Sequence, residues 1–133
     1  MDLRFQSETF TPAEDQSWLG SAHGTEATET ITLDASAFIG TFTDGIIPSG
    51  VVVGKIAASG LYGPYDDEAI DGTEVAAGHL FTTIDTKEGA VDSPAALFTH
   101  GKVVVANLPT DHGLDAAGAA DMPHIRYIGD VPA

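Results

Sequence analysis

Between residues 43 and 108, short apolar or β-branched runs alternate with turns that contain glycine. Glycine adopts the positive φ angles that tight turns need, and an Asp-Gly pair between apolar runs is typical of a β-hairpin. The turn positions are Asp44-Gly45, Gly60, Gly63-Pro64, Asp71-Gly72, Gly78, Glu88-Gly89 and His100-Gly101. Turns spaced this closely predict many short strands and a mainly β fold.

The apolar pattern also indicates where the individual elements lie. Alternating or continuous apolar positions predict strands at 30–34, 51–58, 79–84, 102–108 and 124–128. Ser93-Pro94 favours a helix start with proline at its first position, although a strand over 93–100 is left open. The alanine-rich stretch 114–121 predicts a short helix that ends before Pro123. Residues 31–133 are therefore expected to form one β-rich domain with one or two short helices.

Residues 1–30 have a different character, because polar side chains dominate and no helical or strand period persists. Such a segment by itself buries too little apolar surface to offset the entropy lost on ordering. It nevertheless carries aromatic residues, which leaves two interpretations: a flexible leader, or an extended arm that orders on a partner by strand addition with its aromatics as anchors. We favour the arm, and we expect its contact residues to be Phe5, Phe10, Trp18 and Ile31.

Composition narrows the class of function. The chain has 133 residues, enough for one domain that buries about two-thirds of its surface. Twenty acidic residues against five basic ones give a net charge of −15, which argues against direct binding of nucleic acid or of an anionic membrane. The excess acid either keeps the protein soluble or offers an acidic surface to a basic partner. We expect no disulfide, because cysteine is absent, and no secretory signal or membrane span.

An acidic segment invites comparison with a calcium-binding loop. If Asp67 is the first ligand, Asp71 and Gly72 fall at the fifth and sixth positions as required, but Ala69 and Gly78 occupy the third and twelfth positions, where oxygen ligands are needed. A solvated acidic turn is the better interpretation, and no metal site is expected.

No pattern in the sequence points to catalysis or to a cofactor. The five histidines, none of them three or four residues from another, are His23, His79, His100, His112 and His124. The Asp111-His112 pair comes without a Gly-x-Ser-x-Gly motif or a cysteine nucleophile. We therefore expect a non-enzymatic protein. An alternative from another class is a small carbohydrate-binding β-domain whose stacking residues would be Trp18, Tyr62, Tyr65 and Tyr127.

The order and spacing of one set of positions, from about residue 42 to 128, resembles the head decoration proteins of tailed bacteriophages, typified by the small outer-capsid protein of phage lambda. The set comprises Asp44-Gly45, Pro48, Gly50, Val53-Gly54-Lys55, Tyr62-Gly63-Pro64-Tyr65-Asp66, Asp71-Gly72, Gly78, His100-Gly101-Lys102-Val103 and Ile125-Arg126-Tyr127-Ile128. The resemblance covers roughly two-thirds of the chain. No family motif can be carried onto residues 1–30.

This resemblance implies a β-clip-like small barrel or sandwich with short helices. It also implies a homotrimer that sits at three-fold and quasi-three-fold positions on the outer surface of an expanded head. There it would bind the major capsid protein through an N-terminal arm and hold the shell against the pressure of packaged DNA. Such a protein would be made in the host cytoplasm and end on the virion. Another phage virion module, from the tail or a fibre, is the second interpretation.

Overall fold

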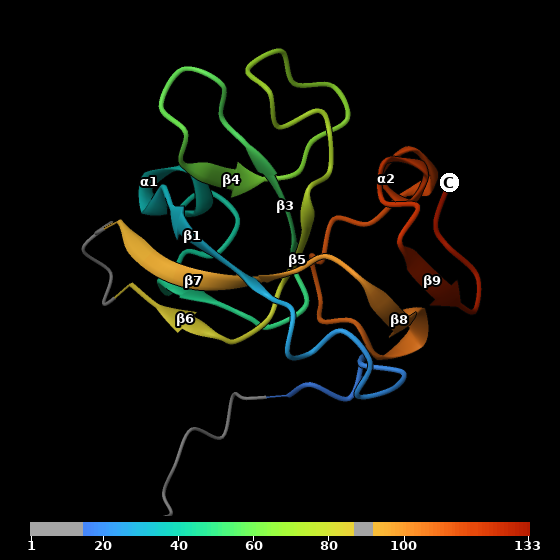
Figure 1. The fold of residues 1–133 in the computed structure, drawn as a ribbon. Helices are drawn as coiled ribbons and strands as arrows, with labels where there is room; N and C mark the ends of the chain where they lie inside the picture. Colours follow the sequence, from blue (N-terminus) through green and yellow to red (C-terminus); the bar gives the residue numbers. More distant parts are fainter. Residues whose placement is uncertain (1–14, 87–91) are drawn as a thin grey trace, which may run out of the picture.

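Five short strands close into a small barrel in the computed structural model, which describes residues 15–86 and 92–133 (Figure 1). Around the barrel the strands are β1 (Glu29–Leu33), β4 (Tyr62–Pro64), β3 (Val52–Lys55), β5 (Gly78–Leu80) and β7 (Ser93–Phe98). The β1–β4 pair is parallel, and the other pairs, including β7 with β1 at the closure, are antiparallel. The predicted mainly β fold with a small barrel is confirmed.

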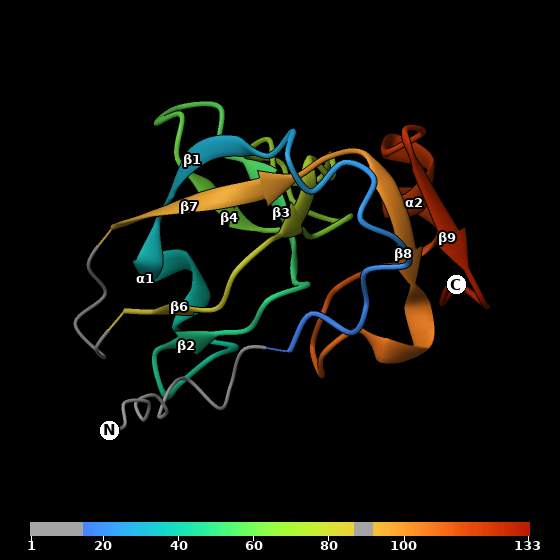
Figure 2. The same cartoon turned by 60° about the horizontal axis from the view of Figure 1, so that its bottom comes forward.

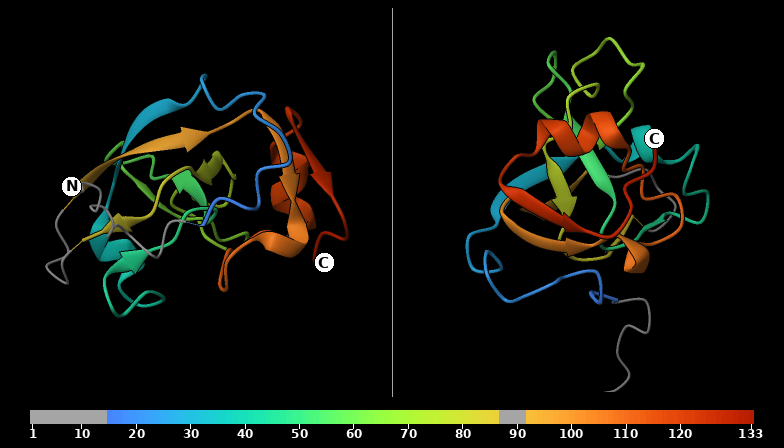
Figure 3. Two further views of the ribbon diagram at one scale, coloured as in Figure 1. Left: turned by 90° about the horizontal axis from the view of Figure 1, so that it is seen from below. Right: turned by 90° about the vertical axis from the view of Figure 1, so that its right-hand side faces the viewer.

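The remaining elements flank the barrel on two sides. Below it, β2 (Ile46–Ile47) pairs with β6 (Ile84–Asp85), and α1 (Ala35–Phe38) follows β1 (Figure 2). Beside it, β8 (Gly101–Val104) and β9 (Ile125–Ile128) form a parallel pair next to α2 (Ala116–Asp121). A 3-10 helix, η2 (Val105–Asn107), continues directly from β8. Figure 3 shows that β8, β9 and α2 form a separate layer against one side of the barrel.

Two hydrophobic clusters meet at β3, and this explains why its apolar run is continuous. Val51 and Val53 belong to the cluster inside the barrel, whereas Val52 between them belongs to the cluster between the barrel and the β8–β9 layer. Successive side chains of a strand point to opposite faces, so a strand buried on both faces needs apolar residues at every position. Leu97 and Phe98 of β7 divide between the two clusters in the same way.

The structure corrects some of the expected elements. Ser93-Pro94 begins the strand β7 rather than a helix. Pro94 pairs only with Thr32 of β1, because β5 joins β7 further along, from Leu97, so the missing proline N–H interrupts no ladder between two neighbours. The strand expected over 102–108 ends at Val104, and the 3-10 helix η2 begins at Val105.

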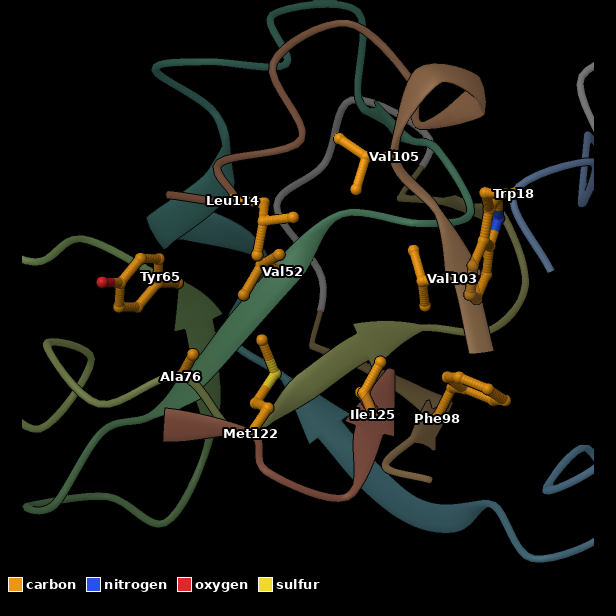
Figure 4. Close-up of a cluster of buried hydrophobic side chains, with 10 residues drawn as sticks. All are labelled: Trp18, Val52, Tyr65, Ala76, Phe98, Val103, Val105, Leu114, Met122 and Ile125. Atoms are coloured by element: carbon orange, nitrogen blue, oxygen red, sulfur yellow. The ribbon is translucent and has the colours of Figure 1, made fainter. Parts of the chain in front are cut away.

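Helix α2 is fixed at its start by a carboxylate that has two partners. Asp115 is the N-cap, and its Oδ1 accepts hydrogen bonds from the Gly118 N–H at 2.8 Å and from the Tyr65 hydroxyl at 2.9 Å. Tyr65 is buried, and it lies in the cluster between the barrel and the second layer (Figure 4). One side chain therefore starts the helix and ties it to the end of β4.

Replacing Asp115 with alanine is expected to lower the free energy of unfolding by about 2 kcal/mol, about half from the lost N-cap and half from the unpaired Tyr65 hydroxyl. Urea unfolding followed by circular dichroism measures the change. Asp115→Asn is the matched control, because its amide oxygen can still accept both bonds and asparagine caps helices as well as aspartate does. An equal loss in both variants would assign the effect to charge instead of capping.

Candidate functional site

Residues 16–20, here called the N-terminal anchor, lie along the edge of β8. The Val104 N–H donates to the Trp18 carbonyl at 2.7 Å, and the Gly20 N–H donates to the Lys102 carbonyl at 2.9 Å. Leu19 forms an antiparallel bridge with Val103. The anchor thus pairs with the edge of β8 through a single bridge, so part of the segment expected to be an arm is integrated into the domain.

Trp18 is the centre of the anchor and has no solvent-exposed surface. Its ring stacks on His79 at 5.5 Å between centroids and meets Phe98 edge-on at 5.4 Å. The indole N–H donates to the Ser49 hydroxyl at 3.0 Å. Figure 4 shows Trp18 beside Phe98 and Val103 within the cluster. The expectation of an exposed aromatic at position 18 is therefore wrong: Trp18 is a core residue.

The other expected contact residues are placed as follows. Ile31 is 6% exposed and belongs to the cluster inside the barrel, so its side chain also serves this chain's own core. Phe5 and Phe10 lie outside the described residues. A role of these residues in partner binding stays a prediction, and for Trp18 and Ile31 it conflicts with the burial of their side chains.

Polar side chains hold the start of the anchor in place. Gln16 Nε2 donates to the Phe81 carbonyl at 2.7 Å, and the Ser49 hydroxyl donates to the same carbonyl at 2.7 Å. Asn107 Nδ2 donates to the Ser17 carbonyl at 3.0 Å. These bonds hold residues 16 and 17 on the surface of the domain.

His79, which stacks on Trp18, has a strongly lowered pKa. Its ring is completely buried, with Nδ1 2.7 Å from the Gly50 carbonyl and Nε2 2.6 Å from the Tyr127 hydroxyl. Because a carbonyl can only accept, Nδ1 carries the proton and Nε2 accepts from Tyr127. The pKa of His79 is lowered to about 4, chiefly because the charged imidazolium would lose its hydration on burial; the bond to the Gly50 carbonyl acts in the opposite direction, and nearby His112 adds a smaller lowering. His79 is thus a neutral structural residue that supports Trp18.

The acidic turn between β4 and β5 has the structure expected of a solvated turn. Asp66 Oδ1 accepts from the Glu68 N–H at 3.0 Å, and Asp71 Oδ1 accepts from the N–H and hydroxyl of Thr73. The bonds from Thr73 lower the pKa of Asp71. In the described parts of the chain, no three His, Asp or Glu side chains gather into a metal-binding group. Ile70 is 97% exposed at the tip of this turn.

The aromatic residues considered for carbohydrate stacking do not form an open platform. Trp18 and Tyr65 are buried, and the Tyr127 hydroxyl is bonded to His79. Tyr62 is half-buried, and its ring packs against the barrel cluster. A sugar needs an exposed ring face to stack on, so the structure speaks against this alternative.

Comparison with known families decides what class of protein this architecture belongs to. The family model described as bacteriophage lambda head decoration protein D matches residues 9–123 of the 133. The chain belongs to this family. As a member of this family, the chain is a structural protein of the phage head that binds the capsid and is located on the virion. The match also favours the head over the alternative of a tail or fibre module.

The family match spans the anchor, the barrel and the layer formed by β8 and α2, so the decoration protein family covers the architecture described above. No curated protein matches the chain. In the part of the decoration protein that the structure describes, no helix is long and apolar enough to cross a membrane.

Proposed function

We propose that this decoration protein binds the outer surface of the expanded phage head as a non-enzymatic homotrimer at three-fold and quasi-three-fold sites. Its partner is the major capsid protein, and binding stabilises the shell against the pressure of packaged DNA. The protein is made in the host cytoplasm and joins the head after expansion. The observation that carries the proposal is the match of the head decoration family over residues 9–123.

The physical basis of stabilisation is mass action. A ligand that binds only the expanded, assembled lattice shifts the equilibrium toward that lattice in proportion to its concentration and affinity. A trimer that engages several capsid subunits at once gains affinity through effective concentration, without strong individual contacts. A net charge of −15 supports a place on the particle exterior, where the protein repels nucleic acid and other virions.

We further propose that residues 1–30 contribute the capsid contact through the part that precedes the anchor, with Phe5 and Phe10 as its apolar side chains. The support is that the Gln16 and Asn107 side chains hold residues 16 and 17, directly after Asp15, on the surface of the domain. Contacts made before this residue are thereby connected to the barrel. Trp18 would act here by holding the anchor on the domain.

Co-sedimentation with expanded, undecorated capsids of the parent virus tests both statements. We expect the full chain to saturate near the number of three-fold sites. A chain that begins at Asp15 should bind at least about tenfold more weakly, because a trimer would lose three contacts at once. This truncation keeps Trp18 and the anchor, so the fluorescence of the single tryptophan reports whether the domain is intact.

The double variant Phe5→Ala/Phe10→Ala in the full chain tests the same contact without shortening the chain. The control for general surface effects is Ile70→Ala, which changes an exposed apolar side chain of the acidic turn. Absence of binding by the full chain would refute capsid decoration. Undiminished binding by the chain that begins at Asp15 would refute the arm but leave decoration in place.

A further inference from the structure

Two histidines that are far apart in the sequence meet at the surface beside the anchor. His23 lies in the turn between the anchor and β1, and His100 lies in the turn between β7 and β8. Their Nε2 atoms are 3.0 Å apart, their ring centroids are 4.4 Å apart, and both residues are exposed. This contact is independent of the capsid proposal.

The ring positions discriminate between two explanations of the contact. A straight N–H···N hydrogen bond places the rings head to head, with centroids about 5.3 Å apart for this nitrogen separation. Two imidazoles that share one ion, with metal–nitrogen bonds of about 2.05 Å, place their centroids about 4.7 Å apart. The observed 4.4 Å is closer to the shared-ion value, and with the ring planes inclined at 64° it excludes a straight head-to-head hydrogen bond.

The two turns that carry these histidines are held together at the backbone. A Cβ added to Gly24 would lie 1.8 Å from the His100 carbonyl oxygen, and one added to Gly101 would lie 2.5 Å from the His23 carbonyl oxygen. Each glycine therefore packs against the backbone of the opposite histidine. Both have positive φ, 88° and 139°, so side-chain-bearing residues would be strained there as well. Close backbone contact between the two turns therefore fixes the relative position of the two imidazole rings.

We propose that His23 and His100 form a bidentate site for a divalent transition-metal ion of the class that prefers imidazole, Cu²⁺, Ni²⁺ or Zn²⁺. With bonds of about 2.05 Å, the nitrogen separation gives a nitrogen–metal–nitrogen angle of about 95°. That angle suits neighbouring positions of square-planar or octahedral Cu²⁺ and Ni²⁺, whereas tetrahedral Zn²⁺ needs the nitrogens a few tenths of an ångström further apart. Water fills the remaining positions.

The site has two protein ligands among the described residues, since no third His, Asp or Glu joins them there. Its affinity is consequently modest, and the ion exchanges readily. A bound ion connects the turn before β1 to the turn before β8 and thereby stabilises the folded state, which alone brings the two ligands together.

Isothermal titration with Ni²⁺ at a pH of about 7.5, using the full chain, tests the proposal. We expect one Ni²⁺ per chain with an affinity at least about tenfold weaker in His23→Asn and in His100→Asn, because even the loss of an outer-shell partner has an effect of that size. The melting temperature should rise with Ni²⁺ in the unmodified protein and not in the double variant. His124→Asn is the matched control at another exposed histidine.

Three results would overturn the site: no binding at millimolar Ni²⁺, unchanged binding in the double variant, or an equal loss in His124→Asn. The last would show general binding by surface histidines. Circular dichroism of each variant separates loss of a ligand from loss of the fold.

Discussion

Replacing Trp18 with alanine is expected to lower the free energy of unfolding by about 3–5 kcal/mol, the usual effect of truncating a fully buried tryptophan. The substitution removes the ring that stacks on His79 and meets Phe98, and it leaves a cavity between the barrel and the β8–β9 layer. Domains are commonly stable by only 5–15 kcal/mol, so the loss is a large share of the total. Urea unfolding followed by circular dichroism provides the measurement.

Ile70→Ala is the control, because Ile70 is also a large apolar residue in the chain but is 97% exposed, and its truncation should change the stability by less than about 0.5 kcal/mol. An unfolding midpoint for Trp18→Ala that equals the unmodified protein's would place residue 18 outside the core. Any capsid-binding defect of Trp18→Ala should result from its lower stability. Under conditions where this variant is fully folded, it should bind capsids as the unmodified protein does.

The second large effect is a loss of stability in acid through His79. The unfolded histidine titrates near pH 6.5, whereas burial lowers the pKa of the folded residue to about 4. Between these values the unfolded state binds more protons, so the stabilising contribution is fully present above pH 6.5 and is lost as the pH falls toward 4. The size of the loss is about 3 kcal/mol.

The comparison with His79→Gln isolates this contribution, because the many carboxylates titrate alike in both proteins and cancel in the difference. We expect the unmodified protein to be the more stable at pH 7, and the gap to shrink by about 3 kcal/mol as the pH falls to 4. Stability curves that run parallel over this interval would mean that His79 keeps an ordinary pKa. The groups facing the ring are Tyr127 and His112, and burial also raises the pKa of Tyr127.

The strands that were predicted correctly from the sequence are those whose own pattern of apolar residues shows which faces are buried. The valines of β3 and the alternation in β1 and β9 allow few other arrangements, and α2 carries its own cap at Asp115. Ser93-Pro94 was misleading because the helix-start signal is local, whereas the pairing of β7 with β1 brings together residues about sixty positions apart. Nothing within such a short window reports that partner.

The role of Trp18 in the anchor could not be predicted from the sequence for the same reason. Trp18 stands among polar residues with no period, a pattern that favours an exposed arm when only neighbours are considered. Its actual environment comes from Ser49, His79 and Phe98, all distant in the sequence. Likewise, His23 and His100 are 77 positions apart, so no motif search could pair them. The family resemblance, by contrast, was accessible because it depends on the order of many turns and strands together.

The position of β1 in the barrel has a consequence for synthesis of the protein. β1 contacts β4 on one side and β7 on the other, so it supplies both ladders at the closure although it is the first strand in the sequence. A chain emerging from the ribosome cannot complete the ring until residue 98 has been made and released. Such distant pairings make folding slow, on the order of milliseconds to seconds. The first strand therefore waits, with an unpaired edge, for nearly three-quarters of the polypeptide to appear.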